Sequence, residues 1–212
     1  MVEEPIGVRQ DAVEYFFYCR DIPGTGALLD ELAEAHWSYM DAYADAMIAR
    51  GPTVAADGVT HTGSMHMVDL PDAEAARAFA FDEPYYKAGV YGEVLIRRWR
   101  SELGRTMWDF EDSGTRDDAR FLIIGHGRPG PTSTDAVLDD HRRYLVNKGY
   151  AEQLIEYGPL SSDDGMEWLG SVMLIELPDQ GAVDAMLQDE PFVLAGLYAS
   201  VEIHHWRFGG RP

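Results

Sequence analysis

The sequence DEPYYKAGVYGEVLIRRWR at residues 82–100 returns as DEPFVLAGLYASVEIHHWR at residues 189–207. The two stretches keep their Asp-Glu-Pro, glycine, tyrosine and Trp-Arg positions in register at a constant separation of 107 residues. The same separation relates Gly51-Pro52 to Gly158-Pro159. Self-similarity at a fixed period is the sequence mark of a duplication. The chain is therefore expected to contain two copies of one structural unit.

The duplication divides the chain into two domains. We place the first unit at residues 1–100 and the second at residues 120–212. Between them, residues 101–119 have the sequence SELGRTMWDFEDSGTRDDA, which is polar, acidic and aperiodic, as expected of a linker.

Each unit predicts the order strand, helix, strand, strand, helix, strand. In the first unit, EYFFYCR at residues 14–20 is typical of a strand. From Leu28 the apolar residues recur every three or four positions, which predicts a helix that runs to Gly51-Pro52. Asp57-Gly58 predicts a hairpin, and a short helix capped by Asp72 is expected to precede the closing strand.

This order of elements predicts an α+β fold. A βαββαβ unit forms a four-stranded antiparallel sheet with both helices on one face, as in ferredoxin-like folds. The other face is apolar and needs cover, so the two tandem units are expected to pack their sheets together as an intramolecular pseudo-dimer. A further homodimer of the whole chain is compatible with this arrangement.

Composition limits the functional classes. The chain has 212 residues, of which 46% are hydrophobic, and a formal net charge of −20. This charge repels a phosphate backbone, so we expect no nucleic-acid partner. No apolar run is long enough to span a bilayer, and we expect no membrane insertion. A single cysteine, Cys19, and an acidic, polar N-terminus make a cytoplasmic location the expectation.

The motifs together resemble a known family. The order FYCRDIPGT, a helix bearing His36, Gly-Pro, Thr-Gly-Ser and DEPYYKAGVYGEV is similar to the YciI-like (YCII-related) proteins of the dimeric α+β barrel superfamily. The resemblance covers residues 14–100 and, more loosely, 120–208. It implies two ferredoxin-like units whose sheets form a dimeric α+β barrel within one chain. It also implies an active-site pair of a helix histidine and the aspartate of the Asp-Pro-like turn. Members of this family include a dehydrochlorinase that acts on a chlorinated hydroxyhydroquinone.

His36 is the first candidate catalytic residue, because it lies on the apolar stripe of the first predicted helix. The resemblance gives Asp82 as its partner, and His141 with Asp189 as the corresponding pair of the second unit. A carboxylate that binds one ring nitrogen makes the other nitrogen a base. The alternative is structural: each histidine is a satisfied core residue, and each aspartate caps the turn that follows the second helix.

Several further side chains are candidates for substrate binding. Tyr39 and Tyr43 are expected to line a cleft between the first helix and the sheet, which suits a mostly apolar ring that carries a few oxygens. Ser64, Ser171 and Tyr91 could hydrogen-bond such a ligand. Their alternative roles are a small residue for close helix packing and a core tyrosine with a solvated hydroxyl.

Metal and nucleotide sites have no support in the sequence. His61 and His66 are five residues apart on one predicted strand, so they are expected to face opposite sides and to share no ion. No phosphate-binding loop is present, and we expect no cofactor. Cys19 is a possible nucleophile if His36 lies nearby; the alternative is a buried strand thiol.

These features predict a cofactor-independent enzyme for a small apolar or aromatic substrate. It would be a lyase or isomerase that acts by proton abstraction, with dehydrochlorinase-like elimination among the possible reactions. Two alternatives stay open. One is a non-catalytic protein that binds a small molecule or a partner. The other is a cofactor-free oxygenase, a class that the wider α+β barrel superfamily includes.

Overall fold

A computed structural model describes residues 12–110, 119–130 and 135–211. Residues 1–11 and residues 111–118 of the predicted linker lie outside the described residues. The strands of the first unit are β1 (Val13–Asp21), β2 (Met47–Val54), β3 (His61–Leu70) and β4 (Tyr91–Trp99), and its helices are α1 (Gly26–Asp41), α2 (Ala73–Phe81) and α3 (Pro84–Lys87). Those of the second unit are β5 (Ala119–Gly127), β6 (Leu154–Ser161), β7 (Trp168–Leu177) and β8 (Tyr198–Trp206), with α4 (Asp135–Asn147), α5 (Gln180–Gln188) and α6 (Pro191–Leu194).

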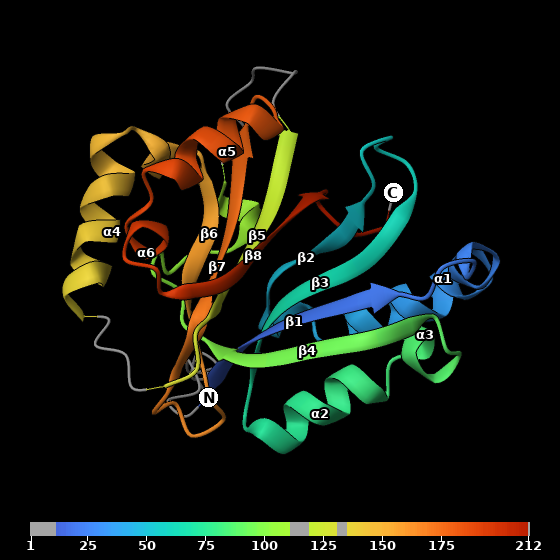
Figure 1. The fold of residues 1–212 in the computed structure, drawn as a ribbon. Helices are drawn as coiled ribbons and strands as arrows, with labels where there is room; N and C mark the ends of the chain where they lie inside the picture. The colour runs from blue at the N-terminus through green and yellow to red at the C-terminus, as the bar shows by residue number, and fades with distance from the viewer. Residues whose placement is uncertain (1–11, 111–118, 131–134, 212) are drawn as a thin grey trace, which may run out of the picture.

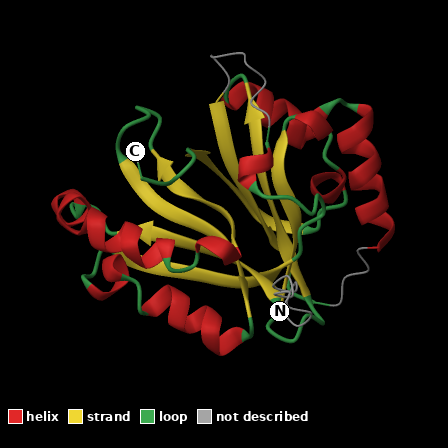
Figure 2. Cartoon of the chain, turned by 180° about the vertical axis from the view of Figure 1, so that it is seen from behind, coloured by secondary structure: helices red, strands yellow, loops and turns green. Residues whose placement is uncertain are grey.

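The predicted α+β barrel is confirmed. Within each unit the strands pair antiparallel, in the order β4-β1-β3-β2 and β8-β5-β7-β6. Two further pairings, β2 with β8 and β4 with β6, close all eight strands into one barrel. The helices of both units lie outside the strands (Figures 1 and 2). The strands alternate accordingly: Phe16 and Tyr18 belong to the central apolar cluster, whereas Tyr15 and Phe17 pack toward the helices.

The first helix is shorter than predicted. Its apolar spacing predicted a helix that continues to Gly51-Pro52, but α1 ends at Asp41 and a 3-10 turn leads into β2. Gly51 and Pro52 therefore lie within a strand, where they pair with Met65 and Ser64 of β3. The prediction failed because Met47 to Ala49 form a short apolar run, and periodicity does not separate a strand from a helix in such a run.

The two units are joined by a reciprocal crossing of backbones. The chain that leaves β8 runs along β2, where the Arg207 N–H donates to the Pro52 carbonyl at 3.1 Å. The chain that leaves β4 runs along β6, and the Arg100 N–H donates to the Pro159 carbonyl at 3.3 Å. A methyl group on Gly51 would lie 1.9 Å from the Arg207 carbonyl oxygen, and one on Gly158 would lie 1.8 Å from that of Arg100. Only glycine allows this approach.

The start of the predicted linker belongs to the core. The backbone N–H of Glu102 donates to the Tyr157 carbonyl of β6 at 3.0 Å. Met107 is 3% exposed and lies in the central cluster with Trp99 and Trp206. The segment after β4 therefore packs against both units instead of crossing solvent between them.

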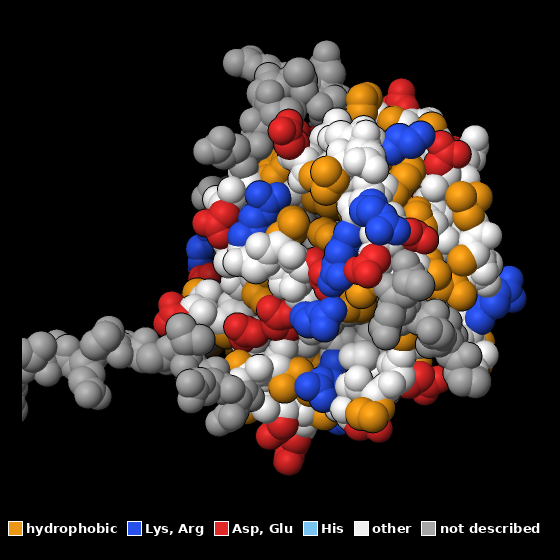
Figure 3. Space-filling view, turned by 90° about the vertical axis from the view of Figure 1, so that its left-hand side faces the viewer, with side chains coloured by type: hydrophobic (Ala, Val, Ile, Leu, Met, Phe, Trp, Pro, Cys, Tyr) orange, Lys and Arg blue, Asp and Glu red, His pale blue; other side chains and the backbone are white. Residues whose placement is uncertain are grey.

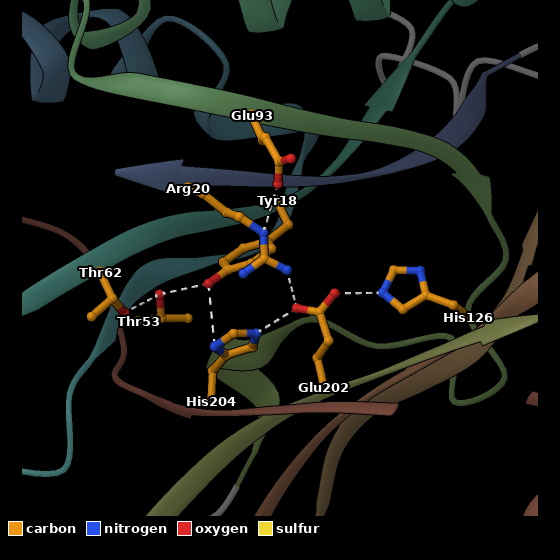
Figure 4. Close-up of polar contacts among 8 residues, drawn as sticks. All are labelled: Tyr18, Arg20, Thr53, Thr62, Glu93, His126, Glu202 and His204. Carbon is orange, nitrogen blue, oxygen red and sulfur yellow. Dashed lines mark hydrogen bonds and ion pairs between the residues drawn. The ribbon is translucent and has the colours of Figure 1, made fainter. Parts of the chain in front are cut away.

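One polar network lies between the two sheets (Figure 4). Arg20 of β1 pairs with Glu202 of β8, whose carboxylate also contacts His126 at 2.6 Å and His204 at 3.0 Å. Because a carboxylate only accepts hydrogen bonds, His204 donates through Nε2 and its Nδ1 accepts from the Tyr18 hydroxyl at 3.3 Å. This network links strands of both units by charge-assisted hydrogen bonds.

The outer surface carries mixed charge. Figure 3 shows the face over the second unit, where Lys and Arg side chains lie close to Asp and Glu side chains. Among the described residues, no helix combines the length and apolar composition required to cross a membrane.

The crossing predicts where the structure is sensitive to a single methyl group. Gly158→Ala and Gly51→Ala are each expected to lower the free energy of unfolding by about 3 kcal/mol, because a backbone carbonyl occupies the required space. Gly26→Ala is the control, since an added methyl group meets nothing within 4 Å there. Urea unfolding monitored by tryptophan fluorescence measures the three variants. Equal stability of all three would contradict the close crossing.

The polar network predicts acid sensitivity. Burial favours the protonated form of Glu202, but bonds from Arg20, His204 and His126 outweigh burial and lower its pKa from 4.5 to about 2. Because the folded pKa is the lower one, this stabilisation is complete above pH 4.5 and is lost as pH falls toward 2. After allowance for solvent screening we expect a contribution on the order of 1–2 kcal/mol. Urea unfolding from pH 7 to 3 is expected to show a smaller acid-dependent loss in Glu202→Gln than in the wild type.

Candidate functional site

A cleft of about 630 Å³ opens in the first unit between α1 and the sheet. We call it the first cleft. Its polar lining residues are Asp30 and His36 of α1, Arg50 of β2, and His61, Ser64 and His66 of β3; its apolar lining includes Trp37, Met40, Tyr85 and Phe208. Such a mixture of a mostly apolar wall with a few polar groups is typical of a small-molecule site.

His36 is held by Glu83 at the edge of this cleft. Nδ1 of His36 lies 2.6 Å from Oε1 of Glu83, and the two side chains are 12% and 3% exposed. The ring also stacks on Tyr85, with centroids 4.3 Å apart. Since the carboxylate accepts, Nδ1 carries the proton and Nε2 of the neutral ring keeps its lone pair. His36 is therefore arranged as a base.

The prediction that Asp82 orients His36 is wrong. A residue before proline is driven to extended backbone, and Glu83 adopts φ −65° and ψ 136° before Pro84. Glu83 is therefore the residue that caps α3, through Oε2 and the Tyr86 N–H at 2.9 Å. Asp82 still belongs to the end of α2, and its carboxylate pairs with Lys87 at the surface. One carboxylate therefore caps α3 and contacts His36, and it belongs to Glu83, the residue after Asp82.

The second unit repeats this arrangement. Nδ1 of His141 lies 2.7 Å from Oε1 of Glu190, and Oε2 of Glu190 accepts from the Val193 N–H at 2.8 Å. The predicted partner, Asp189, pairs instead with Lys148 at 3.0 Å. His141 and Glu190 are 2% and 0% exposed, so this pair is sealed from solvent.

The second cleft is filled. A residual cavity of about 10 Å³ is lined by His141, Tyr157, Trp168, Ser171 and Phe192, among others. Three of these residues are larger or less polar than those at the equivalent positions of the first cleft. Tyr157 is equivalent to Arg50, Trp168 to His61 and Phe192 to Tyr85. Glu102, from the segment between the units, also lines this cavity and binds Arg142 of α4 at 2.6 Å. The second unit thus keeps the histidine–glutamate pair without space for a ligand.

Electrostatics in the first cleft favour a neutral His66. Burial, followed by the repulsion that a protonated His36 would exert and by the charge of Arg50, lowers the pKa of His66 well below 6.5. The ring centroids of His36 and His66 are 6.1 Å apart. Nη1 of Arg50 lies 3.6 Å from Oδ1 of Asp41. The buried Nε of Arg50 has no hydrogen-bond partner among the described residues. The cleft therefore offers a neutral imidazole and a guanidinium to an oxygen-bearing ligand.

Ser64 and Tyr91 form a hydrogen-bonded pair behind the cleft. The Tyr91 hydroxyl donates to Oγ of Ser64 at 2.9 Å, and Ser64 lines the cleft while Tyr91 is 5% exposed. Burial raises the pKa of Tyr91 well above 10, so its hydroxyl stays protonated. Ser64 can then donate its own proton to a ligand. Ser171 and Tyr198 make the same contact in the second unit.

Tyr39 and Tyr43 do not line the cleft, contrary to the prediction. They pack around Phe79 of α2, and the Tyr39 hydroxyl donates to the Phe79 carbonyl at 3.1 Å. Cys19 is also unsuited to the role of nucleophile. It is 4% exposed, and burial, with the nearby carboxylates of Glu83 and Asp21, raises the pKa of its thiol.

The prediction that His61 and His66 face opposite sides is wrong, because both line the first cleft. His61 faces Val54 while Gly63 faces Thr53, so β3 carries one extra residue between them and the strand alternation changes. No group of three or more His, Cys, Asp or Glu residues in the described chain is placed to hold a metal ion.

The second unit contributes a wall to the first cleft. Phe208, Gly209 and Gly210 line it, and the Gly209 N–H donates to the Arg50 carbonyl at 3.0 Å. Arg211 then binds Glu34 and Asp41 of α1. Sequence reasoning missed this contribution because it depends on the path of the chain after the repeat ends.

The corrected pairing predicts a difference between adjacent carboxylates. Glu83→Ala is expected to lower the free energy of unfolding by about 2–4 kcal/mol, because it leaves a partly buried histidine and a helix N–H without their acceptor. Asp82→Ala is expected to change it by less than about 0.5 kcal/mol, since its ion pair is exposed. Thermal and urea unfolding measure both. Greater destabilisation by Asp82→Ala would restore the original assignment.

The chain matches the YCII-related domain family twice, over residues 13–100 and 119–207. These two matches confirm the resemblance and the tandem arrangement. No curated protein sequence matches the chain.

Solved structures show the same fold. A putative monooxygenase from Fusobacterium nucleatum is 8% identical, with a TM-score of 0.54 over 95% of this chain and 94% of that chain. A chlorite dismutase from Candidatus Nitrospira defluvii is 11% identical, with a TM-score of 0.55 over 93% and 92%. A 5-chloro-2-hydroxyhydroquinone dehydrochlorinase from Burkholderia phenoliruptrix is 23% identical, with a TM-score of 0.41 over 43% of this chain and 98% of that chain. At these identities the likeness to the first two structures concerns the fold and not the activity.

Proposed function

This chain belongs to the YCII-related domain family, and we propose that it is a lyase or isomerase in which His36 removes a proton from a small, planar, oxygen-bearing substrate. The observation that carries the proposal is the His36–Glu83 pair at the edge of an open cleft. Glu83 fixes the tautomer and balances the imidazolium that forms when Nε2 takes the proton.

The cleft lining supports this class of substrate. Tyr85, already stacked on His36, and Trp37 offer flat apolar surfaces for a ring. Arg50 and the neutral His66 can stabilise negative charge that develops on a ring oxygen after the proton leaves. Elimination of a substituent, including a dehydrochlorinase-like loss of chloride, and migration of a double bond both begin with such a proton transfer.

One cleft per chain would carry out this chemistry. The His141–Glu190 pair is intact, but Tyr157, Trp168 and Phe192 occupy the space that a substrate needs. The persistence of this pair in a filled cleft also supports a structural role for the contact, because Glu190 caps α6 at the same time. The same reasoning favours a second candidate function for the first unit, the binding of a small molecule without turnover.

Elimination of 5-nitro-1,2-benzisoxazole is the test of the base, because the aromatic probe needs only removal of its C3 proton. Wild-type protein is expected to accelerate the reaction, and His36→Gln to lose about 10²-fold or more of that acceleration. His141→Gln is the matched control and is expected to keep the wild-type rate, since the second cleft is filled. Formation of the coloured phenolate measures the rate.

The opposite outcomes separate the alternatives. Wild-type protein that binds the probe without accelerating its elimination would replace the enzyme with a binding protein. Oxygen consumption during turnover of an oxygenated ring compound would instead indicate a cofactor-free oxygenase.

A further inference from the structure

The first cleft holds a second imidazole–carboxylate pair. Nδ1 of His61 lies 2.5 Å from Oδ2 of Asp21, and the side chains are 25% and 7% exposed. The other oxygen of Asp21 is buried and has no hydrogen-bond partner among the described residues. Because Nδ1 faces the carboxylate, Nε2 is the ring nitrogen that remains available to a ligand. When the ring carries a second proton, the carboxylate of Asp21 balances its charge and Nε2 can donate that proton.

Irregular strand pairing brings this pair together. Asp21 lies at the end of β1, where the pairing with β4 slips between Arg20 and Asp21. His61 begins β3, where the pairing with β2 slips between Thr53 and Val54. Bulges of this kind redirect side chains and are frequent beside functional sites.

The second unit lacks both members of the pair. Trp168 occupies the position of His61, and Gly127 occupies that of Asp21. A methyl group on Gly127 would lie 2.8 Å from the Trp168 ring, so a carboxylate side chain does not fit there. The second unit nevertheless keeps the same strands and the same His141–Glu190 contact. The fold therefore does not require the Asp21–His61 pair, which is present only in the copy whose cleft is open.

We propose that His61, positioned by Asp21, is the acid that donates a proton to the leaving or developing oxygen while His36 acts as the base. This proposal rests on the proposed function and adds the second proton transfer to it. Two pairs of opposite role in one cleft let proton removal and proton delivery occur without free hydroxide or acid. The other titratable or charged residues that line the cleft with His61 are Asp30, His36, Arg50, His66 and Tyr85.

Unsubstituted 1,2-benzisoxazole tests the acid because its product oxygen is basic. His36 takes the C3 proton, and the electrons of that C–H bond form the third carbon–nitrogen bond of a nitrile. The N–O bond breaks with its electron pair on oxygen, and His61 protonates that oxygen to give 2-cyanophenol. The 5-nitro derivative gives a phenolate that its nitro group stabilises, so the rate of its elimination gains little from an acid. It therefore serves as the matched substrate.

His61→Gln is expected to slow elimination of 1,2-benzisoxazole by about 10- to 100-fold and that of the 5-nitro derivative by less than about 2-fold. Asp21→Asn is expected to act in the same direction. His36→Gln is expected to slow both probes.

The outcomes of this experiment are distinct. Equal effects of His61→Gln on the two probes, or no effect on either, overturn the role of His61 while the base function of His36 stands. A wild-type protein that accelerates neither probe above His36→Gln overturns the proposed function itself. Thermal unfolding of His61→Gln is expected to match the wild type; if it does not, His61→Asn supplies the same comparison in a second variant.

Discussion

The crossing of each unit's last strand over the Gly-Pro pair of the other unit is the contact on which the structure depends. Gly51 and Gly158 leave just enough room for the carbonyl groups of Arg207 and Arg100. The indole rings of Trp206 and Trp99 are buried at the same two crossings. This reciprocal contact turns two open sheets into one barrel and covers the apolar face that each sheet would otherwise expose. It also directs the chain after β8 toward the cleft of the first unit.

The two copies provide an internal comparison of structural and functional residues. Contacts found in both, such as His36–Glu83 with His141–Glu190 and Tyr91–Ser64 with Tyr198–Ser171, occur whether or not the cleft is open. The histidine–glutamate contact holds α1 to α3 in the first unit and α4 to α6 in the second, and the tyrosine–serine contact joins two strands of the same sheet. The polar groups that distinguish the open cleft are His61 with Asp21, His66 and Arg50. A catalytic role for His36 and Glu83 therefore depends on the residues that are present only in the first unit.

The sequence predicted the repeat, the order of elements and the packing of two sheets, because these follow from spacing and from the need to cover an apolar face. It misplaced features that depend on a shift of one residue. The carboxylate that meets His36 is Glu83 and not Asp82, because proline fixes which residue caps the short helix. His61 was assigned to the wrong face because strand alternation was assumed to continue through a bulge. Tyr43 does not reach the cleft because α1 ends at Asp41, and Tyr39 lies on the side of α1 that packs against Phe79 of α2. The contribution of Phe208 has no local signal at all, since it arises from contact between units.

The wall that Phe208, Gly209 and Gly210 supply to the first cleft has a consequence for how the duplicated gene can change. In a homodimer, any substitution appears in both subunits. A residue that improves the site of the neighbouring subunit must therefore also be compatible with the site of the subunit that carries it. Fusion removes that constraint. The cleft of the second unit is filled by its own side chains. The C-terminal end of this unit lines the cleft of the first unit. The polypeptide is in this sense a heterodimer with a fixed one-to-one ratio, in which each half completes the barrel of the other.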